Sequence, residues 1–475
     1  MLLFATCGFL PTPYDLQNIQ CDGIELRLDL FHETDLEKLP SFLSTSAIPV
    51  MLTIRHKDHG GMFSGSKAEI FALLVQFVHL HPAWIDVEWE TPNDFRKKLL
   101  AISPKLKLLS SFHDIESTPK DIDLLFSRMQ KNFAHSYKIA SFARSTLDAL
   151  RLLLFAKKCV NHSVTCMGMG AHGCITRILS PVVGNAFCFA PLSLEKATAK
   201  GQISIQELVD RYRIHRLNSL THMCALIGHP VEKSLGDILH NRFFVEQNIN
   251  AVYVKCDLLE EELPSALQMM KDLSFRGLSV TMPLKIAILP LLDELTFRAK
   301  QAHAVNTIFF FNEKSIGDNT DGLGALAAIS KHMNPQHKRV VLLGAGGVAH
   351  AIADVLSRAG AFIEVRNHNL DKAQILAKRV GGCAGAFSEC HHDYDLLINC
   401  LPDTVDVPEE WLAENKYVMD CTYVPKETLF LARAVQKGCK PIYGYEMFLQ
   451  QALLQERRWF SDVQPHFLSE SLFRP

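Results

Sequence analysis

The chain has 475 residues, which corresponds to two to four domains at about 150 residues each. Hydrophobic residues make up 48% and charged residues 21%, a balance typical of a globular enzyme and unlike that of a disordered or fibrous protein. The 49 basic and 51 acidic residues give a formal charge of −2, without the basic surplus that nucleic-acid-binding proteins show.

Targeting and metal-binding signals are absent from the sequence. The longest apolar runs are much shorter than the roughly 20 residues that span a bilayer. Residues 1–10 are apolar but contain no basic segment, which argues against a secretory signal. The 13 cysteines include no Cys-x-x-Cys pair, so we predict neither a zinc site nor a disulfide framework. We expect a cytoplasmic protein with reduced thiols, no metal and no membrane or nucleic-acid partner.

The first 217 residues alternate short β-rich segments with helical segments. Eight strands are predicted, at residues 2–7, 23–30, 50–56, 84–90, 106–114, 136–142, 163–169 and 185–190. Helices are predicted between several of them, at residues 67–79, 122–131 and 146–158. Eight such units predict a (β/α)8 barrel, although about 250 residues are usual for that fold. An open, doubly wound sheet is the alternative.

Ionisable residues gather at the predicted C-terminal ends of these strands, where active sites of barrel enzymes lie. They are Glu25, Arg27, Arg55, Glu88, His113, Lys138 and, in the loop after strand seven, Arg177. Such a set is unusual on strands that otherwise consist of core residues.

Lys138 is the most informative of these residues, because burial in a strand disfavours the ammonium and a neutral amine can form a Schiff base with a ketone. On the preceding strand, His113 is suited to general acid–base catalysis. One strand further back, Glu88 is suited to orienting the imidazole. Taken alone, Lys138 is more simply explained as a strand lysine whose tip reaches water.

The first half resembles type I 3-dehydroquinate dehydratase. The matching stretches are 23–29, 53–55 before Gly60-Gly61, 85–88, 111–114, 137–140, 167–177 and 197–202. The resemblance implies that Lys138 forms an imine with the substrate ketone, that His113 moves the protons, and that Glu88 tunes His113. It assigns the substrate carboxylate to Arg177, and the hydroxyls or site closure to Glu25, Arg27, Arg55, Thr198 and Gln202. Two departures are Thr198-Ala-Lys-Gly-Gln202, where the family has Ser-Ala-Pro-Gly-Gln, and Ala171-His172 before Arg177.

The pattern restarts after a polar, basic stretch at 211–218. We predict a second domain at 222–475, after the dehydratase-like domain at 1–217. It consists of an α/β substrate lobe at 222–325, completed by a C-terminal segment at 444–475 with a helix near 446–458, and a Rossmann lobe at 326–443.

A glycine-rich turn marks the dinucleotide site. An apolar strand at 339–343 leads into Gly344, Ala345, Gly346, Gly347, Val348 and Ala349. This order matches the dinucleotide fingerprint, in which a pyrophosphate lies at the helix N-terminus. The next strand ends in Arg366, Asn367 and His368 rather than in an acidic residue, which favours the 2′-phosphate of NADP over NAD. Arg366 as a solvated strand end is the alternative.

Upstream lies a second polar constellation. Lys285 and Asp321 are suited to proton transfer at a reducible carbonyl, and Asn306 and Thr281 to hydroxyl recognition. Taken singly, Lys285 after a proline is better explained as a helix-start lysine, and Asp321 before a glycine as part of a turn.

The second half resembles shikimate dehydrogenase over residues 222–475. The matching stretches are 228–234, 280–285, 304–307, 317–322, 344–347 and 444–451. The resemblance implies that Lys285 and Asp321 form the catalytic pair, and it assigns the substrate to Ser234, Thr281, Asn306, Tyr423 and Gln451. The departures are Gly236 for a serine, Ser279 for an asparagine and Asn367-His368-Asn369 for Asn-Arg-Thr.

The order of the two halves is similar to that of plant bifunctional dehydratase–dehydrogenases. The resemblance implies dehydration of 3-dehydroquinate to 3-dehydroshikimate, followed by NADPH-dependent reduction to shikimate. The alternatives are a quinate/shikimate dehydrogenase fusion and a non-catalytic metabolite sensor. A sensor is expected to have lost one of the four central residues, Lys138, His113, Lys285 and Asp321, and all are present. The sequence does not indicate an oligomeric state.

Overall fold

The structure is a computed structural model that describes residues 1–17, 19–193, 195, 202–402 and 404–460. Its internal contacts divide the chain into two compact units. The first contains 1–223, 249–258 and 262–274, and the second contains the remaining described residues. None of the helices in the described ranges has the length and apolar character that crossing a membrane requires.

The first unit is built on eight parallel strands in the cyclic order β7-β6-β5-β4-β3-β2-β1-β8. They are β1 (Leu2–Cys7), β2 (Gly23–Arg27), β3 (Val50–Thr53), β4 (Trp84–Glu88), β5 (Lys107–Asp114), β6 (Ser136–Phe142), β7 (Val164–Met169) and β8 (Phe187–Pro191). At the seam between β7 and β8, the Asn185 side chain bonds both backbone groups of Cys166, and Ala186 N–H donates to Val164 C=O. The predicted barrel is therefore confirmed, and the open sheet is excluded.

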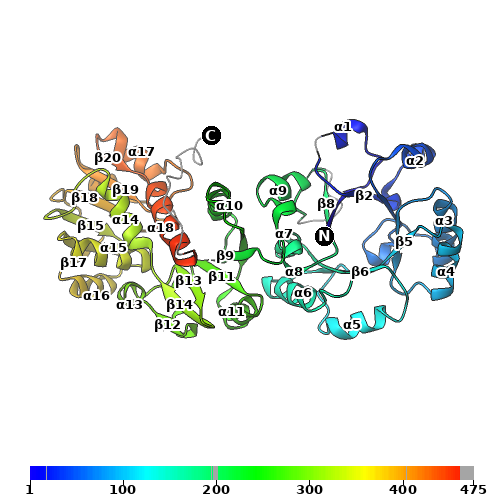
Figure 1. Cartoon of the computed structure of the whole chain (residues 1–475). Helices are drawn as coiled ribbons and strands as arrows, with labels where there is room; N and C mark the ends of the chain where they lie inside the picture. The colour runs from blue at the N-terminus through cyan, green and yellow to red at the C-terminus, as the bar shows by residue number, and fades with distance from the viewer. Residues whose placement is uncertain (18, 194, 196–201, 403, 461–475) are drawn as a thin grey trace. The chain divides into compact units, whose positions relative to one another are not determined.

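Helices surround this ring of strands (Figure 1). They are α1 (Pro13–Leu16), α2 (Glu33–Thr45), α3 (Lys67–Val78), α4 (Asn93–Ile102), α5 (Ile122–Met129), α6 (Thr146–Lys158), α7 (Cys174–Ile178), α8 (Ser180–Val183) and α9 (Ile205–Asp210). The same unit includes β10 (Ala251–Asp257) and α11 (Leu263–Asp272). Lys157 at the end of α6 donates to the carbonyls of Asp272 and Leu273, which satisfies the C-terminus of α11.

Several predicted strands extend further than those of the structure. The second strand ends at Arg27 and the third at Thr53, three residues earlier than predicted. The chain turns there because the Asp29 carboxylate accepts hydrogen bonds from the Arg27 side chain and from the backbone N–H groups of Arg55 and Met62. Apolar patterning continues through these turns, so it does not reveal where the strands stop.

The second unit begins with a mixed sheet in which β9, β11, β13, β14 and β12 follow one another. Its strands are β9 (His222–Gly228), β11 (Phe275–Val280), β12 (Glu294–Leu295), β13 (Thr307–Phe311) and β14 (Lys314–Asp318). Its helices are α10 (Gly236–Glu246), α12 (Leu284–Ala287), α13 (Phe297–Ala302), α14 (Asp321–Ser330) and α18 (Gly444–Trp459). The predicted closing helix corresponds to α18, which packs along α14 and against β11 and β13.

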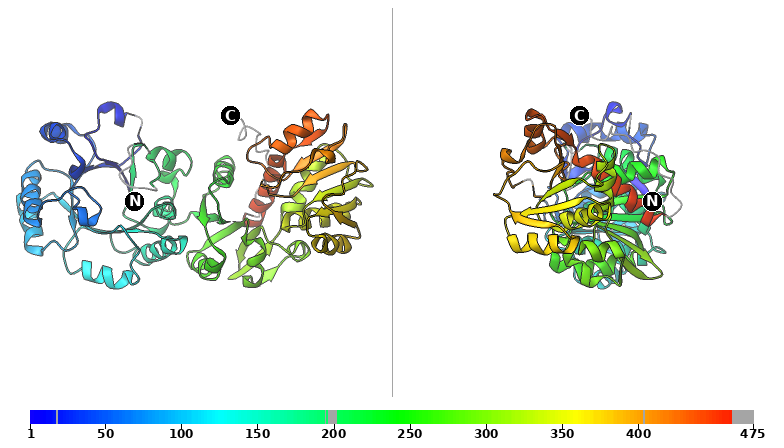
Figure 2. Two further views of the ribbon diagram at one scale, coloured as in Figure 1. Left: turned by 180° about the vertical axis from the view of Figure 1, so that it is seen from behind. Right: turned by 90° about the vertical axis from the view of Figure 1, so that its left-hand side faces the viewer.

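A parallel sheet in the order β17-β16-β15-β18-β19-β20 completes this unit. Its strands are β15 (Arg339–Leu343), β16 (Phe362–Asn367), β17 (Cys383–Ala386), β18 (Leu396–Asn399), β19 (Tyr417–Asp420) and β20 (Lys440–Ile442). Helices α15 (Gly347–Arg358), α16 (Leu370–Val380) and α17 (Leu429–Gln436) follow its strands, and Figure 2 shows it from behind. The order reverses between β15 and β18, and ligands of such sheets bind at that switch point.

The two faces of this sheet bury different clusters. Val340 and Leu342 of β15 pack with α14, α15 and α16, whereas Val341 and Leu343 pack with Trp411 and α17. Alternation along one strand thus fills both faces, as expected for a sheet covered on both sides.

Candidate active sites

Lys138 lies on β6 inside the barrel and is 4% exposed. Its Nζ is 3.5 Å from Glu25 Oε1 and 3.6 Å from Asp86 Oδ2, and it lies 4.2 Å from the centre of the Phe189 ring. The amine is therefore enclosed by charge on two sides and by an aromatic face on a third.

The neighbouring carboxylate of Glu25 is held in its ionised form. Burial alone would raise its pKa, but the positive charges of Lys138, Arg27 and Arg55 lower it. Its two oxygens also accept hydrogen bonds from Thr6 at 2.9 Å and Thr53 at 3.0 Å. Glu25 is thus a fixed negative charge beside the amine.

His113 lies one residue before the end of β5, on the same strand face as Ser111, which pairs with Lys138. Burial, together with the positive charges of Arg55 and Lys138, lowers the pKa of its imidazole well below the usual value. Its Nδ1 is buried and has no hydrogen-bond partner among the described residues. The ring is therefore a neutral base at neutral pH, with one nitrogen unused.

Glu88 does not contact His113 as the sequence analysis predicted. Its Oε1 accepts a hydrogen bond from Arg55 Nη1, and its Oε2 is buried without a partner among the described residues. Glu88 binds Arg55 rather than His113 because a guanidinium attracts a carboxylate more strongly than a neutral imidazole does. The predicted orientation of the imidazole by Glu88 is absent from this structure, and Glu88 orients Arg55 instead.

Asp86 and Ser111 are site residues that the sequence analysis missed. Asp86 accepts hydrogen bonds from Arg55 Nη2 at 2.7 Å and from Ser111 Oγ at 2.5 Å, and it faces Lys138. Asp86 precedes Glu88 by two positions on β4, and Ser111 precedes His113 by two positions on β5. Because side chains two apart share one face of a strand, a buried acid at Asp86 was a readable signal.

Three arginines surround this centre. Arg55 is buried and is shared by Asp86, Glu88 and Ser111, and Arg27 forms a bidentate pair with Asp29. Arg177, in α7, donates to the carbonyls of Gly168 and Phe189, and no acidic side chain among the described residues forms an ion pair with it. Arg177 thus keeps a charge available for an anionic ligand. Gln202 is described, but Thr198 lies outside the described residues.

In the second unit, Lys285 Nζ lies 2.6 Å from Asp321 Oδ2. Asp321 begins α14, where the helix dipole favours a negative charge, and its other oxygen accepts a hydrogen bond from Asn306 Nδ2 at 2.7 Å. The same Nδ2 is 2.9 Å from Thr320 Oγ1 and 3.3 Å from Gln451 Oε1. The structure thus brings together four of the predicted residues: Lys285, Asp321, Asn306 and Gln451.

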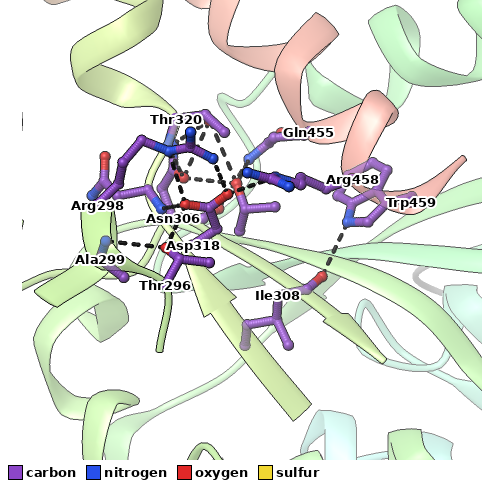
Figure 3. A network of polar contacts seen from close by, with 12 residues as sticks. Thr296, Arg298, Ala299, Asn306, Ile308, Asp318, Thr320, Gln455, Arg458 and Trp459 are labelled. Carbon is purple, nitrogen blue, oxygen red and sulfur yellow. Dashed lines mark hydrogen bonds and ion pairs between the residues drawn. The ribbon is translucent and has the colours of Figure 1, made fainter. Parts of the chain in front are cut away.

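A buried carboxylate, that of Asp318, lies close to Asn306 (Figure 3). Asp318 is fully buried and accepts hydrogen bonds from Thr296, from two nitrogens of Arg298 and from Arg458 Nε. Gln455 of α18 donates to the Asn306 carbonyl at 2.9 Å. Asp318 therefore ties α13 and α18 to the strand that leads into Asp321.

The departure at Ser279 has a local explanation. Its Oγ donates to Gln455 Oε1 at 2.9 Å, so the residue forms part of the support for Asn306. Nothing in the structure explains Gly236, which lies in the first turn of α10.

The remaining predicted substrate residues lie at the ends of other elements. Tyr423 stacks on Phe448 with ring centres 4.2 Å apart. Burial raises the pKa of the Tyr423 hydroxyl, and a hydrogen bond with Ser234 offsets part of that rise. Thr281 directly follows β11, and its N–H donates to Ile227 of β9. Tyr423, with its partner Ser234, thus lies beside Phe448 of α18, the helix that also carries Gln451.

The glycine-rich turn leaves room for a ligand. Gly344 has a φ of +110° and packs against Cys400 and Leu401, so a side chain would be strained there. Gly346 caps α15, and a Cβ placed on it would meet no atom within 4 Å. The structure thus has open space at the N-terminus of a helix, which fits the pyrophosphate of a dinucleotide.

Arg366, at the predicted 2′-phosphate position, has two carboxylate partners. Its guanidinium contacts Glu364 Oε1 at 2.5 Å and Glu389 Oε2 at 2.7 Å. His368 lies against Phe387, with ring centres 4.4 Å apart, and Asn367 donates to the Asn369 carbonyl. A phosphate at this edge would therefore compete with two acids for Arg366.

Comparison with known proteins agrees with this arrangement. Residues 12–219 match the family model for type I 3-dehydroquinase, and residues 226–308 match the model for the shikimate dehydrogenase substrate binding domain. A relative from Chlamydia pneumoniae, named shikimate biosynthesis protein AroDE, is 34% identical over 444 residues, covering 93% of this chain and 90% of the relative. The chain belongs to the bifunctional 3-dehydroquinate dehydratase/shikimate dehydrogenase family.

Other members and solved structures extend the comparison. The bifunctional 3-dehydroquinate dehydratase/shikimate dehydrogenase of Arabidopsis thaliana, described as chloroplastic, is 31% identical, over 91% of this chain and 77% of the plant protein. The structure of shikimate dehydrogenase from Aquifex aeolicus is similar to 52% of this chain with a TM-score of 0.50, 31% identity and 96% of its own length covered. A shikimate dehydrogenase solved with NADP+ also has a TM-score of 0.50, at 34% identity, over 53% of this chain and 93% of its own.

Proposed function

We propose that the chain dehydrates 3-dehydroquinate to 3-dehydroshikimate and then reduces that product to shikimate with NADPH. The first activity is assigned to residues 1–217 and the second to residues 222–475, with a substrate lobe at 222–325 and 444–475 and a Rossmann lobe at 326–443. The observation that carries this proposal is that one chain of the family contains both a buried lysine in a barrel and a lysine–aspartate pair beside a dinucleotide turn. Both substrates are small molecules, and we place the enzyme in the cytoplasm.

For the dehydration, Lys138 attacks the C3 ketone and forms an imine with loss of water. The protonated imine then acidifies the C2 proton, which the neutral imidazole of His113 removes. The same imidazole protonates the C1 hydroxyl as it leaves as water, and hydrolysis of the imine releases the product. Asp86 and Glu25 hold the amine in place, since both lie within 3.6 Å of Nζ.

Substrate binding in the barrel is assigned by charge. Arg177 takes the carboxylate, because among the described residues its guanidinium bonds only neutral carbonyls. Glu25, Arg27, Arg55, Thr198 and Gln202 bind the hydroxyl groups or close the site. Glu88 acts through Arg55, which its carboxylate holds.

For the reduction, Lys285 and Asp321 hold a proton at the carbonyl oxygen of the substrate and transfer it as the carbonyl becomes an alcohol. Asn306 fixes the Asp321 carboxylate, and together with Ser234, Thr281, Tyr423 and Gln451 it binds the hydroxyl and carboxylate groups. These side chains reach the substrate from separate loops, which suits recognition of a ring with several hydroxyls.

NADPH supplies the hydride when it is bound. The backbone of Gly344 to Ala349 would hold its pyrophosphate, since the turn is open at Gly346. The adenosine ribose would lie toward Arg366, Asn367 and His368. A preference for NADP, as in the name of a relative, would depend on contacts of these residues with the 2′-phosphate.

The test is a coupled assay of the whole chain. Addition of 3-dehydroquinate and NADPH should make the absorbance of the reduced cofactor fall, and no fall should occur when either is omitted. Shikimate should accumulate in a one-to-one ratio to oxidised cofactor. Cofactor oxidation with quinate as the reduced product, rather than shikimate, would contradict the assignment of two consecutive steps.

A further inference from the structure

Two cysteines lie side by side at the C-terminal edge of the Rossmann sheet. Cys400 directly follows β18 and Cys421 directly follows β19, and these parallel strands pair Asn399 with Asp420. The Cys421 N–H donates to the Asn399 carbonyl at 3.0 Å. The two sulfur atoms are 3.8 Å apart.

This separation suits disulfide formation. Neighbouring strands are about 4.8 Å apart, which lies within the range of roughly 4.4–6.8 Å between the Cα atoms of a disulfide. Rotation of the side chains could bring the sulfurs from 3.8 Å to a bond length of about 2.05 Å. Both residues are free thiols and half-buried, so small reagents can reach them.

The two thiols are not equivalent. The hydrogen bond with Cys400 and burial raise the pKa of Cys421 well above its usual value, so Cys421 keeps its proton at neutral pH. Either sulfur can donate in the contact between the two thiols. A thiolate is the nucleophile in thiol–disulfide exchange. Because Cys421 keeps its proton, we assign the first attack to Cys400.

The pair lies against the dinucleotide turn of the proposed dehydrogenase site. A Cβ placed on Gly344 would meet the carbonyl carbon of Cys400 at 3.4 Å and Leu401 at 3.2 Å, so the dithiol segment packs directly on the dinucleotide turn. The charge of Asp321 contributes to the raised pKa of Cys421, which places that thiol within electrostatic reach of the proposed catalytic pair.

We infer that Cys400 and Cys421 form an oxidisable dithiol that switches the dehydrogenase site off when it closes to a disulfide. In the reaction, Cys400 attacks a low-molecular-weight disulfide and releases one thiol. Cys421 then attacks the mixed disulfide, releases the second thiol and gives up its proton. Formation of the disulfide moves the segment of Cys400 and Leu401. Because this segment packs closely against Gly344, the movement disturbs the dinucleotide turn and so cofactor binding. This inference rests on the proposed dehydrogenase activity.

The test compares reduced and oxidised chain after treatment with glutathione disulfide. The oxidised chain should be lighter by two hydrogen atoms and should give a peptide that links Cys400 with Cys421. Its dehydrogenase kcat/KM for NADPH should fall at least tenfold, its dehydratase activity should stay unchanged, and dithiothreitol should restore the loss.

Two variants make the test specific. Cys421→Ser should resist inactivation, whereas Cys390→Ser, which removes a half-buried cysteine elsewhere in the same lobe, should lose activity like the parent. Formation of the disulfide without loss of activity, or equal inactivation of Cys421→Ser, would overturn the proposal. Failure to link the two residues at all would also overturn it.

A third measurement separates this proposal from the proposed function. Phenylarsine oxide bonds two neighbouring thiols at once, so one equivalent should protect Cys400 and Cys421 together from alkylation, and Cys421→Ser should abolish that protection. If the reduced parent does not reduce 3-dehydroshikimate, the proposed function fails, while this labelling still reports on the pair. Independent alkylation of the two thiols in the presence of the arsenical would contradict the dithiol itself.

Discussion

The amine of Lys138 is enclosed by Glu25, Asp86 and the face of Phe189. The nearby imidazole of His113 is neutral. A neutral base close to a lysine in a closed space is the arrangement that imine chemistry on a ketone needs.

Reduction of the imine should mark Lys138. Borohydride added together with 3-dehydroquinate should attach the substrate skeleton covalently to this lysine and inactivate the dehydratase, while the dehydrogenase stays active. Peptide mass mapping locates the adduct. An adduct on another lysine, or none, would exclude the imine route.

The titration of His113 should set the acid limb of the dehydratase. Because burial and the charges of Arg55 and Lys138 lower its pKa, the imidazole stays unprotonated as the pH falls through 6.5, the usual histidine value. We therefore expect kcat/KM to decline only below pH 6.5. A decline that begins above pH 7 would show that another group, or a protonated His113, controls the reaction.

Arg366 allows a paired test of cofactor recognition. If it binds the 2′-phosphate, Arg366→Ala removes a charge-assisted contact worth about 1.5–3 kcal/mol, or one to two decades of NADPH affinity, and leaves NADH nearly unaffected. Glu389→Gln removes one of its two carboxylate partners and should tighten NADPH selectively. Fluorescence titration gives the dissociation constants of NADPH and NADH for the parent and both variants, and these constants test the assignment. Equal weakening of both cofactors by Arg366→Ala would assign the phosphate to other residues.

Local sequence patterns explain how much of the site was predictable. Lys138 lies inside a strand, His113 lies near a strand end, and Lys285 and Asp321 lie at helix starts, all in elements that the sequence identifies. The partner of Glu88 was not predictable, since Arg55 is 33 residues away and competes with His113 only in the folded barrel. Likewise, Glu389 reaches Arg366 only through the pairing of β16 with β17.

At the scale of elements, the carboxylate of Asp318 holds α13 and α18 to the strand that precedes Asp321, the proposed catalytic aspartate (Figure 3). Burial alone would raise its pKa, but the hydrogen bonds from Arg298 and Thr296 and the charge of Arg458 lower it. A carboxylate with a lowered pKa in the folded state contributes stability above its unfolded pKa, near 3.9, and loses it as the pH falls further.

Asp318→Asn should therefore destabilise the second unit by about 1.5–3 kcal/mol at pH 7, because it removes the charge from hydrogen bonds with two arginines. The difference from the parent should shrink below about pH 4, where the parent carboxylate is protonated as well. Urea unfolding at both pH values measures this. Asp354→Asn, which breaks an exposed pair with Arg358 in α15, is the matched control and should cost less than 1 kcal/mol. An effect of Asp318→Asn no larger than the control would contradict the role of Asp318.

The elements themselves were predicted well where apolar periodicity dominates. The eight barrel strands and α6 occur at the predicted positions, with ends that shift by up to three residues. Strand ends depend on distant partners. The Asp29 carboxylate, for example, accepts a hydrogen bond from the Met62 N–H, a contact that the fold creates and the local sequence pattern does not reveal. The assignment of β10 and α11 to the first compact unit could not be predicted either, because it reflects tertiary contacts such as that of Lys157 with the end of α11.

At the scale of the whole molecule, the account describes two complete chemical sites in one chain, each with its own lysine. The sites use different chemistry: the barrel holds a buried amine with a neutral base, and the second unit holds a lysine–aspartate pair beside a dinucleotide turn. The first reaction needs no cofactor, and the second consumes its product. Each lysine should therefore be dispensable for the other reaction.

The most direct test is the pair of variants Lys138→Ala and Lys285→Ala, each supplied with 3-dehydroquinate and NADPH. Lys138→Ala should oxidise no cofactor until 3-dehydroshikimate is added, whereas Lys285→Ala should accumulate 3-dehydroshikimate and leave NADPH unused. A mixture of the two variants should restore formation of shikimate. Loss of both activities in either folded variant, or a mixture that stays inactive, would contradict the claim of two separate active sites.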